Sequence, residues 1–267
     1  MPFAALMLNA RINLQVCWLN MMGCNIVIAT YNSENTLSRC LESVRAISAE
    51  VSCNVILVDG ASEDNTLGVA KEFADIVDVV ISEPDSGVYE AWNKGLAFCS
   101  HQWVIFLGSD DYVCPSEFLE YLSFVKNQQG TDFVSCQVRY VDIDGRTIRV
   151  VGRPWDWRSF KKYMCAIHPG SFTSLDYIRR VGEFDESLKI CGDYELLLRA
   201  GDTLKAAHWP GAPICMQVGG LSDGIRVLNE TLVVKLKHGY RGRVLSLVDY
   251  ATSIAKYLVR KQLTRSR

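Results

Sequence analysis

Short apolar runs recur through the first part of the chain, and each is followed by a polar segment. They are Asn25–Thr30, Asn54–Val58, Val77–Ile81 and Trp103–Leu107. Runs of this length, rich in β-branched and aromatic residues, are typical of strands that are buried on both faces of a parallel sheet. The pattern therefore predicts four parallel strands, of which Trp103–Leu107 is the clearest buried one.

The segments between these runs have the periodicity of amphipathic helices. They are Glu34–Val44, Thr66–Phe73 and Tyr89–Ser100. Alternation of strand and helix predicts right-handed crossovers and an α/β, Rossmann-like, mainly parallel sheet flanked by helices. No G-x-G-x-x-G follows the first strand and no G-x-x-x-x-G-K-[ST] occurs, so a dinucleotide-binding Rossmann enzyme and a P-loop kinase or ATPase are excluded.

The second half of the chain has no regular strand–helix rhythm. Strand-like residues at Phe133–Val138 and Tyr140–Asp142 are followed by Asp144-Gly145, a hairpin signal, before Thr147–Val150. Further on, Ala166–Thr173 leads into a predicted helix at Leu175–Val181, and a second helix is expected to run from Ile190 to Arg199.

Composition narrows the class of protein. The 267 residues are 49% hydrophobic and 22% charged, which fits either one large α/β domain or a domain with a small appendage. A net charge of −2 argues against a nucleic-acid partner. The ten cysteines form no C-x-x-C pair, which argues against a zinc site or a disulfide framework and fits a cytoplasmic protein.

The amino-terminal segment differs from the rest. Residues 1–23 are moderately apolar but interrupted by polar side chains such as Asn9 and Arg11, and no run reaches the roughly 18 apolar residues of a membrane span. We expect this segment to be a leader outside the fold, with Met21 or Met22 as the natural start. The alternative is a short interfacial helix.

Polar side chains end each predicted strand. They are Thr30-Tyr31-Asn32, Asp59, Asp85 and Asp110-Asp111. The carboxyl ends of parallel strands meet at one edge of a sheet, where open α/β sheets bind ligands. Paired carboxylates suit Mg²⁺ or Mn²⁺, which prefers oxygen ligands. The alternative for Asp110-Asp111 is an ordinary turn before a helix at Cys114–Glu117.

These blocks resemble the inverting family 2 glycosyltransferases with the GT-A fold. The similarity rests on Ile26–Asn32, Val58–Asp64, Gly108–Asp111, Gly182–Glu186 and Gly192–Glu195. In addition, Ser82–Tyr89 with Ala91–Gly95 is similar to the bacterial branch that builds capsular, colanic-acid or O-antigen glycans. The resemblance covers about residues 25 to 220.

The resemblance implies roles for particular residues. The donor, a UDP- or GDP-sugar, would be bound by Thr30, Tyr31, Asn32, Asp59, Asp85, Asn93, Lys94 and Asp110. Asp111 would hold Mn²⁺ or Mg²⁺, and Asp193 would be the general base that deprotonates the acceptor hydroxyl. Where the family often has Glu-Asp, this chain has Gly192-Asp193, and Glu195 is the second candidate on the acceptor side.

Three of the candidate residues keep an alternative interpretation. His168 would help hold the metal, the diphosphate or the acceptor, or be a buried histidine bonded to backbone. Trp155 would stack on an acceptor sugar or lie in the core. Lys94 would meet phosphate or be a solvated surface residue.

The carboxyl-terminal residues form a basic, helical extension. Residues 24–222 are expected to form the catalytic domain, with a donor half at 24–112 and an acceptor half at 113–222, and 223–267 the extension. Val244, Leu247 and Leu258 belong to one apolar stripe. The stripe would lie on the inner face of the cell membrane, or pack on the catalytic domain or on a second subunit in a homodimer.

The resulting hypothesis is an enzyme of the hexosyltransferase type that makes bacterial surface polysaccharide. It would transfer a sugar to a hydroxyl of a glycan acceptor, polyprenyl-linked in the simplest case, by a metal-assisted single displacement. The alternative is a non-catalytic nucleotide-sugar-binding or scaffold protein with the same fold. Such a protein would be expected to lose Asp59, Asp110, Asp111 and Asp193, and all four are present.

Overall fold

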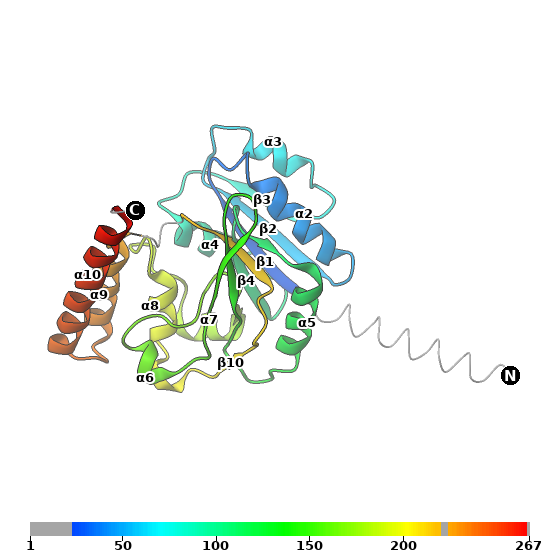
Figure 1. Cartoon of the computed structure of the whole chain (residues 1–267). Coiled ribbons are helices and arrows are strands. Elements are labelled where there is room, and N and C mark those ends of the chain that lie inside the picture. The colour runs from blue at the N-terminus through cyan, green and yellow to red at the C-terminus, as the bar shows by residue number, and fades with distance from the viewer. Residues whose placement is uncertain (1–22, 220–223, 266–267) are drawn as a thin grey trace.

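A central sheet runs through the molecule, and helices cover both of its faces (Figure 1). This computed structural model describes residues 23–219 and 224–265, so nearly all of the expected leader at 1–23 lies outside the described residues. In sheet order the strands are β10 (Ala206–His208), β6 (Phe133–Ser135), β9 (Phe172–Ser174), β4 (Trp103–Gly108), β1 (Cys24–Thr30), β2 (Cys53–Asp59) and β3 (Val79–Ser82).

All neighbouring strands of this sheet are parallel except β9, which is antiparallel to both β4 and β6. The predicted mainly parallel α/β fold is therefore confirmed. The sequence had suggested that the residues up to Thr173 lead directly into a helix, and β9 was not expected. A three-residue strand is too short to show a periodicity, and it exists because β4 and β6 lie on either side of it.

The helices follow the expected order, with shifted ends. They are α2 (Leu37–Ser48), α3 (Thr66–Lys71), α4 (Val88–Leu96), α5 (Pro115–Lys126), α6 (Trp157–Phe160), α7 (Leu175–Val181), α8 (Gly192–Leu198), the 3₁₀ turn η1 (Gly201–Thr203), α9 (Ile225–His238) and α10 (Arg243–Arg265). The first begins at Leu37 rather than Glu34, because Glu34 lies in a turn where its carboxylate accepts the Asn65 N–H and its own N–H donates to Asp64.

Alternate side chains of the central strands enter two hydrophobic cores. Ile26 and Ile28 of β1 belong to the core beneath α2 and α5, whereas Val27 belongs to the core beneath α4, α7 and α8. All three side chains are completely buried. Burial on both faces explains why the strands read as continuous apolar runs rather than as an alternating pattern.

A second, smaller sheet lies beside the carboxyl edge of the first. Its order is β5 (Tyr112–Val113), β11 (Ile214–Gln217), β7 (Val138–Val141) and β8 (Thr147–Val151). The antiparallel pairing of β7 with β8 confirms the hairpin predicted at Asp144-Gly145. Strands from both expected halves of the domain pair in the central sheet, so the boundary at residue 112 does not separate two independent cores.

The carboxyl-terminal extension is a helical hairpin. Helix α9 packs on α8, and α10 packs on α9 at the outer side of the molecule (Figure 1). The expected apolar stripe of α10 is not covered by the domain, since Val244 is 74% exposed and Leu247 and Leu258 are about half exposed. Within the described residues, no helix combines the length and the apolar character needed to cross a membrane.

Candidate active site

A cavity of about 420 Å³ opens at the carboxyl end of β4. Its wall contains the ends of β4, β7 and β11, the first turns of α4 and α8, the segment before α8, and two residues of α9. The side chains that carry chemistry in it are Tyr89, Asp110, Asp111, His168, Lys189 and Asp193. Residues expected on the donor side and on the acceptor side thus meet in one cavity.

The Asp110-Asp111 turn is held in place by its own backbone. The Asp111 carboxylate accepts the Gly108 N–H at 3.0 Å, and its own N–H donates to the Gly108 carbonyl at 3.1 Å. From α2, Arg39 donates to the Asp110 carbonyl at 3.2 Å and to the Gln217 side chain at 2.9 Å. Asp110 and Asp111 therefore form the turn that was one prediction for this segment, and the same turn presents the pair of carboxylates that was the other.

Asp111 is 5% exposed. Burial, and secondly the adjacent charge of Asp110, raises the pKa of Asp111 to about 8, although the Gly108 N–H opposes the shift. A buried carboxylate next to a second, half-buried one is stabilised in its charged form by a cation. Its oxygen atoms have the chemistry that Mg²⁺ and Mn²⁺ require.

His168 lies in the wall of the same cavity and is 1% exposed. Its ring packs against an aromatic cluster: it is stacked on Phe106, with centroids 5.5 Å apart, and tilted against Trp92, with centroids 5.4 Å apart. Neither ring nitrogen has a hydrogen-bond partner among the described residues, so the backbone-bonded alternative does not apply. Burial lowers the pKa of His168 to about 3, which leaves a neutral ring that can bind a metal or accept a hydrogen bond.

The residues present fit a divalent ion only in part. Within the described residues, no three His, Cys, Asp or Glu side chains are grouped closely enough to hold a metal by themselves. Mg²⁺ usually takes one or two carboxylates and completes its shell with substrate phosphates and water. Asp110 and Asp111 supply the carboxylate part of that donor set, and the unpartnered His168 lies in the same cavity wall without completing a three-residue metal site among the described residues.

Asp193 is at the amino-terminal end of α8 and faces the cavity. Its carboxylate accepts the Tyr194 N–H at 2.7 Å, and the Tyr89 hydroxyl lies 3.3 Å away. Burial raises the pKa of Asp193 to about 6, while these two hydrogen bonds partly oppose the rise. A carboxylate with this pKa is ionised at neutral pH and is a stronger base than an exposed aspartate.

Tyr89 explains why glycine precedes Asp193. A Cβ placed on Gly192 would lie 2.8 Å from the Tyr89 ring, closer than carbon atoms can approach. The ring is almost fully buried, and its hydroxyl donates to the Ile190 carbonyl at 2.7 Å. Sequence reasoning did not single out Tyr89, and its only signal was its position at the start of a helix after Asp85.

Further along the same carboxyl edge, Asp59 is at the end of β2 and is fully buried. It is the residue that pairs with Thr30 of the neighbouring strand β1. Its carboxylate accepts hydrogen bonds from the Ser62 N–H at 3.0 Å and the Ser82 hydroxyl at 2.7 Å. The Thr30 hydroxyl is buried and has no hydrogen-bond partner among the described residues. The Asp85 carboxylate lies close to Gly60, the residue after Asp59, since a Cβ built on Gly60 would be only 2.8 Å from it. Asp85 is therefore beside Asp59 and Thr30.

The loop after β1 presents the remaining donor-side candidates. Tyr31 is 62% exposed, so its ring is accessible to a ligand. Asn32 has a φ of 47°, a left-handed conformation that asparagine tolerates, and its side chain accepts the Glu63 N–H at 2.9 Å. Thr30, Tyr31, Asn32, Asp59 and Asp85 therefore lie at one edge, as the strand order predicted.

Among the described residues, only Asp110, Asp111, His168 and Asp193 of the predicted site line the cavity itself. Asn93, Lys94 and Trp155 lie outside its lining and are held by other contacts. The Asn93 side chain bonds the Phe184 backbone, with both contacts at 3.0 Å, and so ties α4 to the loop before α8. Lys94 donates to the Pro84 carbonyl at 2.9 Å. Trp155 packs on Phe160 with ring centroids 4.1 Å apart.

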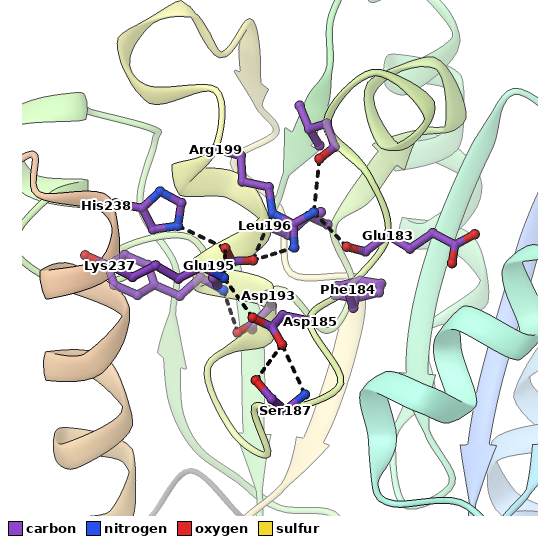
Figure 2. A network of polar contacts seen from close by, with 12 residues as sticks. Glu183, Phe184, Asp185, Ser187, Asp193, Glu195, Leu196, Arg199, Lys237 and His238 are labelled. Atoms are coloured by element: carbon purple, nitrogen blue, oxygen red, sulfur yellow. Dashed lines mark hydrogen bonds and ion pairs between the residues drawn. The ribbon is translucent and has the colours of Figure 1, made fainter.

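Glu195 does not line the cavity either and is 1% exposed; Figure 2 shows it in contact with Arg199, Lys237 and His238. It forms ion pairs with Arg199 at 2.5 Å and Lys237 at 2.9 Å, and its other contact is His238 at 3.0 Å. Burial alone would raise the pKa of Glu195, but the hydrogen bonds from these three side chains hold it well below its ordinary range. Glu195 therefore joins α8 to α9.

Comparison with known proteins identifies the family. Residues 25–176 match the glycosyl transferase family 2. The chain is 27% identical over 188 residues to the PGL/p-HBAD biosynthesis glycosyltransferase of Mycobacterium tuberculosis, a match that covers 66% of this chain and 68% of that protein. These similarities do not assign the chain to the capsular, colanic-acid or O-antigen branch.

Solved structures share the fold at low sequence identity. One is the mannosyltransferase PcManGT from Pyrobaculum calidifontis in complex with GDP-Man and Mn²⁺, with a TM-score of 0.62 at 17% identity. The aligned residues cover 88% of this chain and 75% of the PcManGT chain. S. aureus TarS 1–349 in complex with UDP-GlcNAc has a TM-score of 0.61 at 17% identity, covering 80% and 66%. The chain spans 39% of the longer TarS structure. Because the family match extends over more than half of the sequence, this chain belongs to glycosyl transferase family 2, with a GT-A fold.

Proposed function

We propose that the chain transfers a sugar from a UDP- or GDP-sugar to a hydroxyl of a glycan acceptor, with inversion at the anomeric carbon. The observation that carries the proposal is that one cavity is lined both by Asp193 and by the Asp110-Asp111 turn. A single displacement requires two parts. One is a base for the acceptor hydroxyl, and the other is a set of anionic oxygens that can hold a metal ion together with the donor diphosphate.

In the proposed reaction, Asp193 accepts the proton of the acceptor hydroxyl while that oxygen forms a bond to the anomeric carbon. The bond between this carbon and the nucleoside diphosphate breaks, and the diphosphate leaves with the electron pair. The pKa of about 6 supports the assignment, because Asp193 is then ionised before the reaction and able to take up a proton.

The donor would lie along the edge formed by the ends of β1, β2 and β4. Asp59 and Thr30 are buried polar groups suited to the base and ribose, and exposed Tyr31 borders the same edge. Solved proteins of this fold bind UDP-GlcNAc and GDP-Man, which supports a nucleotide-sugar donor. The identity of the nucleobase is open between uracil and guanine.

Asp111 would hold the divalent ion, with Asp110 beside it and His168 as a further ligand. When bound, the ion neutralises charge that develops on the leaving diphosphate. The structure of PcManGT contains Mn²⁺ together with GDP-Man, which supports this choice of metal. Asn93 and Lys94 would act on the donor side indirectly, by fixing the segments around α4 to which they bond.

The acceptor would be a surface glycan of bacteria carried on a lipid, at the inner face of the cell membrane. The exposed stripe of α10 (Val244, Leu247 and Leu258), on a helix rich in lysine and arginine, supports contact with an anionic membrane. A homodimer would cover the same stripe, so sedimentation of the protein with and without anionic vesicles distinguishes the two arrangements.

The test is turnover with a panel of UDP- and GDP-sugars and a lipid-linked glycan acceptor in the presence of Mn²⁺. Release of the nucleoside diphosphate should depend on the acceptor, and the product linkage should have the anomeric configuration opposite to that of the donor. Asp193→Asn should abolish turnover but keep the stabilisation by donor and Mn²⁺ in a melting experiment. Undiminished turnover in this variant, or retention of configuration, would refute the proposed mechanism.

A further inference from the structure

Glu230 of α9 binds the backbone just ahead of α8. One oxygen of its carboxylate accepts the Lys189 N–H at 2.8 Å, and the other accepts the N–H groups of Ile190 and Cys191 at 2.6 and 2.5 Å. Three consecutive backbone donors that converge on one carboxylate form an anion-binding loop, and here the anion is supplied by another helix of the same chain.

The bound segment leads directly into the catalytic region. The Ile190 carbonyl accepts the Tyr89 hydroxyl, and the Cys191 carbonyl accepts the Glu195 N–H at 2.9 Å in the first turn of α8. Asp193 follows Cys191 by two residues. A displacement of this segment would therefore move both the aspartate and the tyrosine hydroxyl beside it.

Two further sets of contacts join α9 to the same region. The Cys191 thiol lies 3.6 Å from the Val227 carbonyl and 3.4 Å from the Thr231 hydroxyl, and these two residues of α9 also line the cavity. One turn or more further along, Lys237 and His238 pair with the buried Glu195 (Figure 2). Helix α9 thus contacts α8 on both sides of Asp193.

We propose that Glu230 is a positioning residue, which binds the segment Lys189–Cys191 so that Asp193 is held in the cavity. On this basis α9 contributes to catalysis. The carboxyl-terminal extension then has a role in the active site in addition to any contact with a membrane or a second subunit. The proposal rests on the function proposed above, because it requires Asp193 to be the base.

Glu230 also acts on Asp193 through its charge. Burial is the main cause of the raised pKa of Asp193, and the negative charge of Glu230 adds to it. The other titratable groups near Asp193 are Tyr89 of α4 and, in the wall of the cavity, Tyr194 of α8, Tyr140 of β7, Lys189, Cys191, His168, Asp110 and Asp111. Removing the charge of Glu230 should therefore lower the pKa of Asp193, a change that a purely structural role would not produce.

The test compares Glu230→Gln, Glu230→Asp and a control in the holoenzyme with Mn²⁺. Glutamine has one acceptor oxygen, and its NH₂ group would face a backbone donor, so the segment is released. We expect kcat of Glu230→Gln to fall about 10- to 100-fold, because a small misplacement of a catalytic group has an effect of this size. The KM for the donor should stay within about twofold, since the donor residues belong to other strands.

The pH dependence separates position from charge. In Glu230→Gln the acid limb of the kcat profile should move to lower pH, whereas Glu230→Asp keeps the charge and should show a smaller fall in kcat with the limb unmoved. The control is Glu120→Gln, which removes a charge from the exposed side of α5 on the opposite face of the sheet and should match the wild type in both respects.

The results distinguish this proposal from the one on which it rests. If Asp193→Asn retains turnover, the base assignment fails. If Asp193→Asn is inactive but Glu230→Gln has the kcat and acid limb of the wild type, the positioning role of Glu230 is refuted and the base assignment stands. If Glu230→Gln does not fold, a wild-type kcat in Glu230→Asp refutes the positioning role, because the shorter side chain cannot keep all three hydrogen bonds.

Discussion

Replacing Glu195 by glutamine tests the buried ion network that joins α8 to α9. The carboxylate is 1% exposed and contacts Arg199 at 2.5 Å, Lys237 at 2.9 Å and His238 at 3.0 Å. Glutamine keeps the shape of the side chain but carries no charge, and its NH₂ group would face these donors. We expect a large loss of stability.

The size of the loss follows from the burial of each partner. Removing one member of a buried ion pair costs about 3–5 kcal/mol, because the remaining charge is left without compensation. Here the remaining charges are partly accessible to water, with Arg199 20% and Lys237 49% exposed, which relieves part of the penalty. We therefore expect about 3 kcal/mol, at the lower end of that range, and a fall in melting temperature of roughly 6–12 °C.

The assay is denaturant unfolding, in which the midpoint should fall while the slope is unchanged. The matched control is Asp75→Asn, which removes an equally short ion pair, at 2.6 Å, between side chains that are 42% and 58% exposed. Its midpoint should not change measurably, since exposed pairs contribute little. Equal losses in the two variants would refute the argument from burial.

The pH dependence gives a second check on the same network. The ion pairs hold the pKa of Glu195 below its ordinary value of 4.5, so the folded protein binds fewer protons there than the unfolded chain. Its contribution to stability is then complete above about pH 4.5 and is lost as the pH falls below that value. The difference between wild type and Glu195→Gln should therefore shrink in acid, and a difference that stays constant would contradict the assignment.

Three further predictions concern the reaction and the core. The acid limb of kcat/KM should lie near pH 6, because the pKa of Asp193 is raised to about 6 and only the ionised form accepts a proton; a limb near pH 4 would contradict this. Asp111→Asn should remove the Mn²⁺-dependent part of the stabilisation by UDP or GDP in melting experiments, and EDTA should do the same to the wild type. Gly95→Ala should lower the free energy of unfolding by about 1–3 kcal/mol, measured as a lower denaturant midpoint, because its Cβ would lie 2.5 Å from a methyl group of Val27 on β1; an unchanged midpoint would show that α4 can shift.

Much of the fold was predictable from local pattern. The four apolar runs became β1, β2, β3 and β4. Strands β1, β2 and β4 lie inside the sheet, and a strand buried on both faces has no polar side and is recognisable by its composition alone. Strand β3 is at the edge of the sheet, and its Val80 is 50% exposed. Parallel strands end at one edge, so the order of the elements was enough to bring Asp59, Asp85 and Asp111 to that edge. The hairpin of β7 and β8 followed from its Asp-Gly turn.

The sequence by itself therefore determined the four parallel strands β1 to β4, the helices between them and the acids at their carboxyl ends, because each depends on periodicity and on turn chemistry over a few neighbouring residues. Only the tertiary structure decided that His168 has no hydrogen-bond partner among the described residues, that the Tyr89 ring occupies the space above Gly192, and that Glu230 binds the segment before α8. These relations join residues that are far apart in the chain. Whether a buried polar group finds a partner depends on how the helices pack, which no local pattern of residues specifies.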